Sequence, residues 1–235
     1  ELVDLLLADS RDMLRHLFVD NAPFRGALLD YLMNIQAFDQ ITYLIRDLEE
    51  AERIRMVESW SALADEIQDE AVATSWRVAA GLGWMVTGHH DRAWEMWQGA
   101  LRRDPRFLKK IMALCNRLPD FDLSSLHNRL RIIRLIVAAG KRDESLSLLQ
   151  ALGAEKPENA LQILIEIPEI MGEDVVERDV CQLRFNLACQ LADRELMGNV
   201  IADMLQLDEA DLFAFQKQAL VNLEDRQFKR YVLLQ

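Results

Sequence analysis

The sequence predicts an all-α protein built from stacked helical repeats, and three observations indicate this fold class. Apolar residues in nearly every segment recur with the period of a helix, and no Asn-Gly or Asp-Gly hairpin signal interrupts them. A pattern of acidic and apolar positions recurs every 52 residues. Of the 235 residues, 51% are apolar and only 9 are Gly and 5 Pro, which favours a large core with few long loops.

The 52-residue pattern is seen in columns of equivalent positions. The acidic column contains Asp39, Asp91, Asp143 and Glu195. Two apolar columns follow it, one with Ile45, Trp97, Leu149 and Ile201, the other with Leu48, Ala100, Leu152 and Met204. A fixed period of this kind is typical of a solenoid. We therefore expect a single helical-repeat domain over residues 1–235, with an N-terminal helix and four repeats at about 19–70, 71–122, 123–174 and 175–226.

Each repeat is predicted to contain three helices, A, B and C. In the second repeat, helix A covers about 74–87, helix B covers about 91–103 and helix C begins at Pro105. Asp104-Pro105 is typical of a helix start, because Asp caps unpaired amides and Pro lacks one. The acidic column lies in the first turn of helix B, where a carboxylate complements the helix dipole. Equivalent A–B turns are expected near Gln36, Gly88, Gly140 and Ala192.

The last repeat is expected to differ from the others in helix C. At the column where the first three repeats are apolar, the fourth has Gln216. A repeat at the end of a stack needs a polar outer face. We therefore predict a capping role for this helix.

The bulk composition excludes several classes of partner. A net charge of −12 argues against nucleic-acid binding and against adsorption to an anionic membrane. No apolar run is long enough to predict membrane insertion. Cys115, Cys181 and Cys189 lie among apolar neighbours, which we interpret as buried thiols in a reducing, cytoplasmic protein. Because the chain opens on Glu1 and both ends are helix-like, we expect it to be a fragment of a longer protein.

The second repeat resembles a tetratricopeptide repeat (TPR) over residues 74–105. The positions that match the motif are Gly81, Trp84, Gly88, Ala93, Trp97, Ala100 and Pro105. Residues 126–157 match less closely, through Ile133, Ile136, Gly140, Ser145, Leu149, Leu152 and Pro157. The resemblance implies a right-handed α-solenoid in which small residues let helices A and B approach and aromatic residues fill the space between them. The 52-residue period departs from the roughly 34 residues of the family, and helix C is the extra segment.

The resemblance also implies that helix A binds peptides on its concave face. The implied positions are Ser75, Val78, Leu82 and Met85 in the second repeat, His127, Leu130, Arg134 and Val137 in the third, and Asp179, Gln182, Asn186 and Cys189 in the fourth. The polar members His127, Arg134, Asp179 and Asn186 could hydrogen-bond a ligand backbone. Ordinary solvated surface is the alternative interpretation.

Two groups of basic residues indicate an acidic partner. Arg25, Arg77 and Arg129 recur at the 52-residue period, and they could hold a partner's carboxylates or pair with the protein's own acids. The densest basic cluster contains Arg102, Arg103, Arg106, Lys109 and Lys110. The dipole of helix B accounts for its first two members but not for the last three, at the start of helix C. We interpret Arg106, Lys109 and Lys110 as a partner-binding patch, with solvated surface as the alternative.

Trp94 is a further candidate contact residue. It lies between the columns that face inward, so we expect it to be exposed, and an exposed Trp often anchors a protein contact.

No catalytic or metal-binding motif is present in the sequence. There is no Gly-rich phosphate loop, no His-Glu-x-x-His and no Gly-x-Ser-x-Gly. His89 and His90 lack the further ligands of a tetrahedral metal site. We therefore expect no cofactor and predict a non-catalytic interaction scaffold or adaptor that binds a protein or peptide segment. The alternatives are a regulatory sensor module of a larger signalling or transcription-regulating protein and, less in keeping with the motifs, an enzyme.

Overall fold

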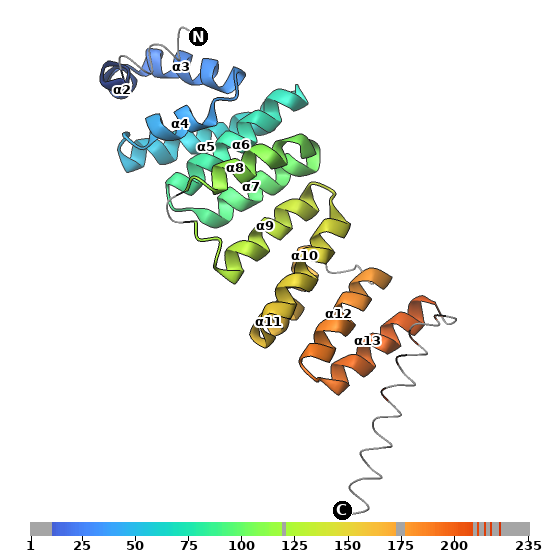
Figure 1. The fold of residues 1–235 in the computed structure, drawn as a ribbon. Coiled ribbons are helices and arrows are strands. Elements are labelled where there is room, and N and C mark those ends of the chain that lie inside the picture. The colour runs from blue at the N-terminus through green and yellow to red at the C-terminus, as the bar shows by residue number, and fades with distance from the viewer. Residues whose placement is uncertain are drawn as a thin grey trace, which may run out of the picture. The chain divides into compact units, whose positions relative to one another are not determined.

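A computed structural model describes residues 11–118, 121–172 and 177–208, and the single positions 211, 214, 217 and 221. These residues are helical with connecting turns and contain no strand, which confirms the predicted all-α class (Figure 1). The chain divides into two compact units. The N-terminal unit comprises residues 1–122 and 138–140, and the C-terminal unit comprises residues 123–137 and 141–235.

The helices follow the order expected for three-helix repeats. The first repeat contains α3 (Ala22–Asn34), α4 (Phe38–Ile45) and α5 (Glu50–Glu66), after α2 (Arg11–Asp20). The second contains α6 (Glu70–Val86), α7 (His90–Arg103), the short 3-10 helix η1 (Pro105–Phe107) and α8 (Leu108–Cys115). The third contains α9 (Leu126–Ala138), α10 (Arg142–Glu155) and α11 (Pro157–Met171), and the fourth contains α12 (Arg178–Gln190) and α13 (Arg194–Leu207). Gln216 and the expected capping helix lie outside the described residues.

The turn between helices A and B is the same structure in all four repeats. Its central residue has a positive φ at Gln36 (54°), Gly88 (80°), Gly140 (75°) and Ala192 (53°). The next residue donates its amide to the carbonyl five positions earlier, as in the bond from His89 to Trp84 (2.9 Å). This left-handed C-terminal cap satisfies carbonyls that the helix end leaves unpaired. The four predicted turn positions are therefore confirmed, and helix B starts 52 residues apart at residues 38, 90, 142 and 194.

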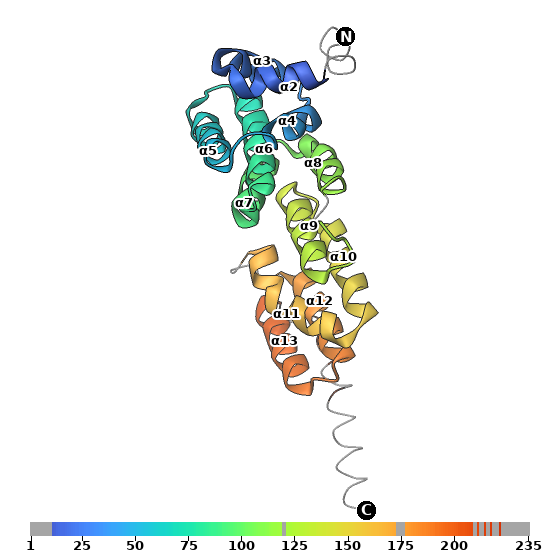
Figure 2. The same cartoon turned by 90° about the vertical axis from the view of Figure 1, so that its left-hand side faces the viewer.

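Helix α6 is the central helix of the N-terminal unit. It packs against α3, α4, α5 and α7 (Figure 2). Most of its 17 residues are buried. It begins at Glu70, four residues before the expected start, because the Asp69 carboxylate accepts hydrogen bonds from the amides of Ala71 (2.9 Å) and Val72 (3.1 Å). A helix that is covered on nearly all sides must be apolar all round, and the Ala-rich sequence of α6 meets this requirement.

Two glycines set the close approach of α6 to its neighbours. A Cβ atom at Gly81 would lie 2.5 Å from the indole of Trp97 on α7, and one at Gly83 would collide with Val57 on α5. Trp97 is fully buried and donates its indole N–H to the carbonyl of Val78 (3.0 Å). The predicted burial of Trp97 between helices A and B is confirmed. Its aromatic neighbour, however, is Trp94, with ring centres 5.4 Å apart, and not the expected Trp84. Trp84 lies on the α5 side, where its indole N–H bonds the Ser61 hydroxyl (3.1 Å).

The C-terminal unit has two clusters of core residues. The larger draws on α9, α10, α11 and α12, and the smaller draws on α12 and α13 with Ala214. Gly153 on α10 occupies a point where a Cβ would collide with Leu187 on α12. Both apolar columns of the repeat are buried in every repeat, across the two units.

Candidate functional site

The predicted basic patch lies where η1 passes into α8 in the N-terminal unit. Asp104 caps this start by accepting the amide of Arg106 (3.0 Å). The guanidinium of Arg106 folds back on the same carboxylate, with Nη2 2.8 Å from Oδ2. This hydrogen bond lowers the pKa of Asp104 and raises the pKa of Arg106. Arg106 is exposed, but part of its charge is already neutralised within the protein.

Lys110 extends from α8 to the first A–B turn. Its ammonium lies 5.4 Å from the ring centre of the buried Phe107 and donates a hydrogen bond to the side-chain oxygen of Gln36. The Gln36 amide nitrogen lies 3.4 Å from the Ser75 hydroxyl on α6. A hollow of about 280 Å³ lies at this point, lined by Gln36, Asp104, Arg106, Phe107 and Lys110. Lys109, next to this hollow in sequence, is also exposed.

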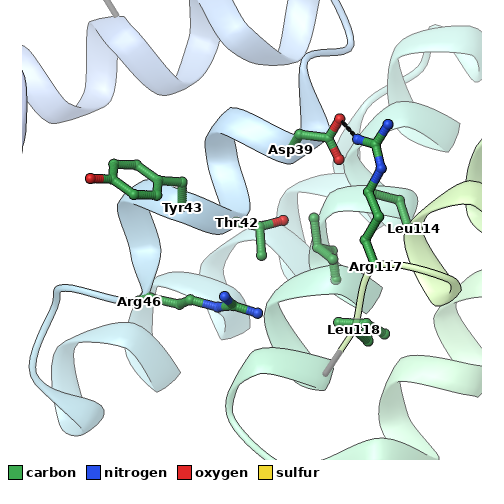
Figure 3. Close-up of a pocket in the computed structure, with 8 residues that line it drawn as sticks. Asp39, Thr42, Tyr43, Arg46, Leu114, Arg117 and Leu118 are labelled. Atoms are coloured by element: carbon green, nitrogen blue, oxygen red, sulfur yellow. Dashed lines mark hydrogen bonds and ion pairs between the residues drawn. The ribbon is translucent and has the colours of Figure 1, made fainter. Parts of the chain in front are cut away.

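A second hollow, of about 220 Å³, lies between α4 and the end of α8 (Figure 3). From α4 and the residue after it, Asp39, Thr42, Tyr43 and Arg46 line it. From α8 and the residues that follow it, Leu114, Arg117 and Leu118 line it, and Leu82 of α6 completes the lining. The Arg117 guanidinium pairs with the Asp39 carboxylate, and this pairing raises the pKa of Arg117. Arg46 is exposed, and Figure 3 shows its guanidinium directed across the hollow toward the Leu118 side.

Trp94 is buried, so the prediction of an exposed contact residue is wrong. Its side chain is only 4% exposed. The indole packs edge-on against Trp97, with ring centres 5.4 Å apart, and lies 5.6 Å from the ring of Phe121. Phe121 belongs to the segment that follows α8. It covers Trp94 on a face of α7 that the two apolar columns of the repeat do not occupy. Trp94 is therefore part of the core of the N-terminal unit.

The three periodic arginines all pair with acids of the protein. The Nη2 atom of Arg25 lies 2.7 Å from Oε1 of Glu52. The Nη2 atom of Arg129 lies 2.5 Å from Oε1 of Glu155. Arg77 is almost fully buried and lies 2.6 Å from Asp65. The Arg25 pair connects helix A to helix C of the same repeat, and the Arg77 pair connects helix A to helix C of the preceding repeat. The Arg129 pair connects helix A to the last residue of helix B in the same repeat. The geometry favours the structural interpretation of this column over a ladder of partner-binding guanidinium groups.

The helix A positions implied by the resemblance fall into two groups. In the second repeat, Ser75, Val78, Leu82 and Met85 are all at most 7% exposed, so the expected open peptide groove is absent from α6. Its place is taken by the protein's own helices α3, α4, α5 and α7.

In the third and fourth repeats, the polar helix A positions remain at the surface of the C-terminal unit. His127 and Asp179 are exposed. Arg134 pairs with Glu166 (3.0 Å) and Glu169 (2.6 Å), and Asn186 donates to Gln150 (3.0 Å). Because the side chains of Arg134 and Asn186 already have partners, they are less suited to bind a ligand backbone.

The cysteines also differ in part from expectation. Cys115 and Cys181 are buried, and burial raises the pKa of the Cys115 thiol to about 12. Cys189 is exposed, so the prediction of three buried thiols is wrong at this position. It is the penultimate residue of α12, and its sulfur lies 3.4 Å from the Met197 sulfur on α13. All three are free thiols.

Within the described ranges, no group of three or more His, Cys, Asp or Glu side chains could hold a metal ion. Over the same residues, no helix is both long and apolar enough to cross a bilayer.

The sequence did not indicate the α4 side of the two hollows. Gln36 and Lys110 are 74 residues apart, and Asp39 and Arg117 are 78 residues apart. The only available signal was that Gln36 and Asp39 belong to the turn and acidic columns of the repeat.

Comparison of the chain with known protein families, with curated proteins and with solved structures finds no match.

Proposed function

We propose that this chain is a non-catalytic interaction scaffold, a TPR-like right-handed α-solenoid that binds an acidic segment of a partner protein on the α8 surface. The observation that carries this proposal is the exposed cluster of Arg106, Lys109 and Lys110 beside a hollow of about 280 Å³. In a chain with a net charge of −12, such a cluster attracts acidic segments locally while the remainder of the surface repels them.

The contacts within the cluster single out the two lysines. Arg106 forms an ion pair with Asp104, and this pair partly neutralises its positive charge. Lys110 bonds a neutral amide, that of Gln36, and keeps its full positive charge. Lys109 is exposed and forms no ion pair with the residues that the structure describes. Lys109 and Lys110 therefore supply most of the attraction to a carboxylate.

The cytoplasm is the compartment we propose for this scaffold. Its three cysteines are free thiols, and such thiols persist in reducing compartments. Nucleic acid is not proposed as a partner, because a phosphate backbone requires a more extended basic face than this acidic chain offers.

Selection of peptides on the intact chain tests this proposal. A phage library of random 12-residue peptides is selected on the wild-type protein and on Lys109→Glu/Lys110→Glu. We expect the wild type to enrich Asp- and Glu-rich peptides, and we expect the double variant to lose that enrichment. Binding of the enriched peptides should also weaken as salt rises, because exposed charges are screened within about 8–10 Å at physiological ionic strength.

Arg55→Glu/Lys141→Glu is the matched control. It changes the net charge by the same amount at exposed positions on α5 and at the start of helix B in the third repeat. Selection of the same acidic peptides by the two double variants would contradict a local α8 site. Absence of acidic enrichment on the wild type would contradict the proposed function as a whole.

A further inference from the structure

The two hollows lie along one seam between α4 and α8. On one side are Gln36 of the first turn and the α4 positions that follow it; on the other are the α8 positions that follow Phe107. Side chains cross the seam at two points, from Lys110 to Gln36 and from Arg117 to Asp39. The hollow in Figure 3 adjoins the Arg117–Asp39 crossing. The seam is therefore a slot with polar cross-links rather than a packed helix–helix interface.

The cross-link from Arg117 to Asp39 is easily exchanged. The two side chains are 64% and 50% exposed, and an ion pair in such a position contributes little to stability. A carboxylate of a ligand can replace Asp39 as the partner of Arg117 at small cost. Leu82, by contrast, is 1% exposed and stays fixed at the bottom of the hollow.

Charge along the slot favours an anionic occupant. The cations that line its two hollows are Arg46, Arg106, Lys110 and Arg117, and the acids are Asp39 and Asp104. Lys109, an exposed neighbour of Lys110 in the sequence, adds a further positive charge beside the slot. This excess of positive charge lies in a chain whose net charge is −12. Arg46 and Arg117 approach the same hollow from opposite walls, so both guanidinium groups can reach one extended segment laid along the seam.

Size and lining identify the rest of the occupant. The hollow of about 220 Å³ is smaller than the roughly 300–1,000 Å³ of typical small-molecule pockets. Its apolar lining comes from Leu82, Leu114 and Leu118, which suits one aliphatic side chain. A phosphate or a single free carboxylate would leave this apolar surface uncovered.

We propose that the slot between α4 and α8 binds an acidic peptide segment through one aliphatic side chain flanked by carboxylates. The aliphatic side chain enters the hollow over Leu82, Leu114 and Leu118, and the carboxylates pair with Arg46 and Arg117. This inference rests on the proposed function and deepens it. It adds an apolar pocket for one aliphatic side chain and two further cations, Arg46 and Arg117, to the basic cluster of α8.

Two labelled 12-residue peptides test the slot on the intact chain by fluorescence anisotropy. One carries Glu-Glu-Leu-Glu-Glu at its centre, and the other carries Ser in place of Leu. We expect the wild type to bind the Leu peptide about tenfold more tightly, because burial of an aliphatic side chain in an apolar pocket is worth about one power of ten in affinity. Arg46→Glu should weaken both peptides about tenfold, since it replaces an attraction by a repulsion.

Leu118→Ser and Arg55→Glu complete the design. Leu118→Ser should abolish the preference for Leu while leaving binding of the Ser peptide within about twofold of wild type. Arg55→Glu, an exposed reversal on α5, should leave both affinities within about twofold. Circular dichroism checks that each variant keeps its helical content.

The outcomes separate the slot from the broader proposal. If Arg46→Glu behaves like Arg55→Glu while Lys109→Glu/Lys110→Glu loses binding, the scaffold proposal stands and the slot is overturned. The slot is also overturned if the wild type binds the two peptides equally. If neither acidic peptide binds the wild type, both proposals are overturned.

Discussion

The contact between Gly81 and Trp97 provides a test of the helix packing that the repeat requires. Trp97 is fully buried on α7, and its indole stands where a Cβ at Gly81 on α6 would lie, 2.5 Å away. Trp97→Ala should cost about 3–5 kcal/mol in the free energy of unfolding, the range for truncating a large buried aromatic side chain. The Val78 carbonyl, which accepts the indole N–H at 3.0 Å, also loses this partner. Because α6 also packs against α5, the loss should extend to α5.

Gly81→Ala should have opposite effects in the two backgrounds. In the wild type, overpacking costs about 1–3 kcal/mol, and the better helix propensity of Ala returns about 1 kcal/mol. The net loss is therefore about 0–2 kcal/mol. In Trp97→Ala the indole is gone and the Ala93 carbonyl oxygen, 3.1 Å from the Cβ position, is the close neighbour that remains. Gly81→Ala should therefore stabilise this background by at most about 0.5–1 kcal/mol. The two positions should couple by about 1–3 kcal/mol.

Urea unfolding followed by circular dichroism measures all four members of this cycle. Gly26→Ala is the matched control, because a Cβ at this position in α3 has no atom within 4 Å. It should stabilise both backgrounds by about 0.5–1 kcal/mol. Additive effects of Gly81→Ala and Trp97→Ala, within about 0.5 kcal/mol, would show that the α6–α7 approach is wrongly assigned. A loss of less than about 1 kcal/mol in Trp97→Ala would refute its role in the core.

Two further predictions concern the repeat turns and the cap of η1. Ala192→Gly should stabilise the protein and Gly140→Ala should destabilise it, each by about 1 kcal/mol in thermal melts, because both positions have φ in the left-handed region; equal signs would contradict the shared turn geometry. Asp104→Asn should reduce the urea midpoint at about pH 7, and this reduction should shrink as the pH falls below about 4. The Arg106 hydrogen bond lowers the folded-state pKa of Asp104, so its contribution is present above the unfolded pKa and is lost as pH falls through the folded one. A pH-independent difference between wild type and Asp104→Asn would contradict this account.

The helix boundaries and turns could largely be predicted from sequence, because local interactions determine them. The left-handed caps at Gly88 and Gly140 and the helix start at Asp104-Pro105 depend on residues within one turn of the chain. Gln36 and Ala192 also adopt positive φ, although neither is glycine. These two turns could be predicted because Gln36 and Ala192 occupy the same column of the repeat as Gly88 and Gly140.

Burial of residues outside the main apolar face of a helix could not be predicted in this way. Trp94 is covered by Phe121, and Ser75 and Met85 are covered because α6 packs against four other helices. Periodicity identifies one inward face of a helix. It does not show how many neighbours the helix will have, and that number distinguishes an open groove from a filled core.

The candidate site depends on tertiary structure in the same way. The sequence singled out Arg106, Lys109 and Lys110, because cations at a helix start are locally unfavourable and call for another explanation. Gln36, Asp39 and Arg46 carry no such local signal. Only packing around α6 brings α4 next to α8, across 74 and 78 residues of chain in the two cross-links. Charge and helix periodicity are properties of short segments, whereas a slot is formed by the spacing of two distant helices.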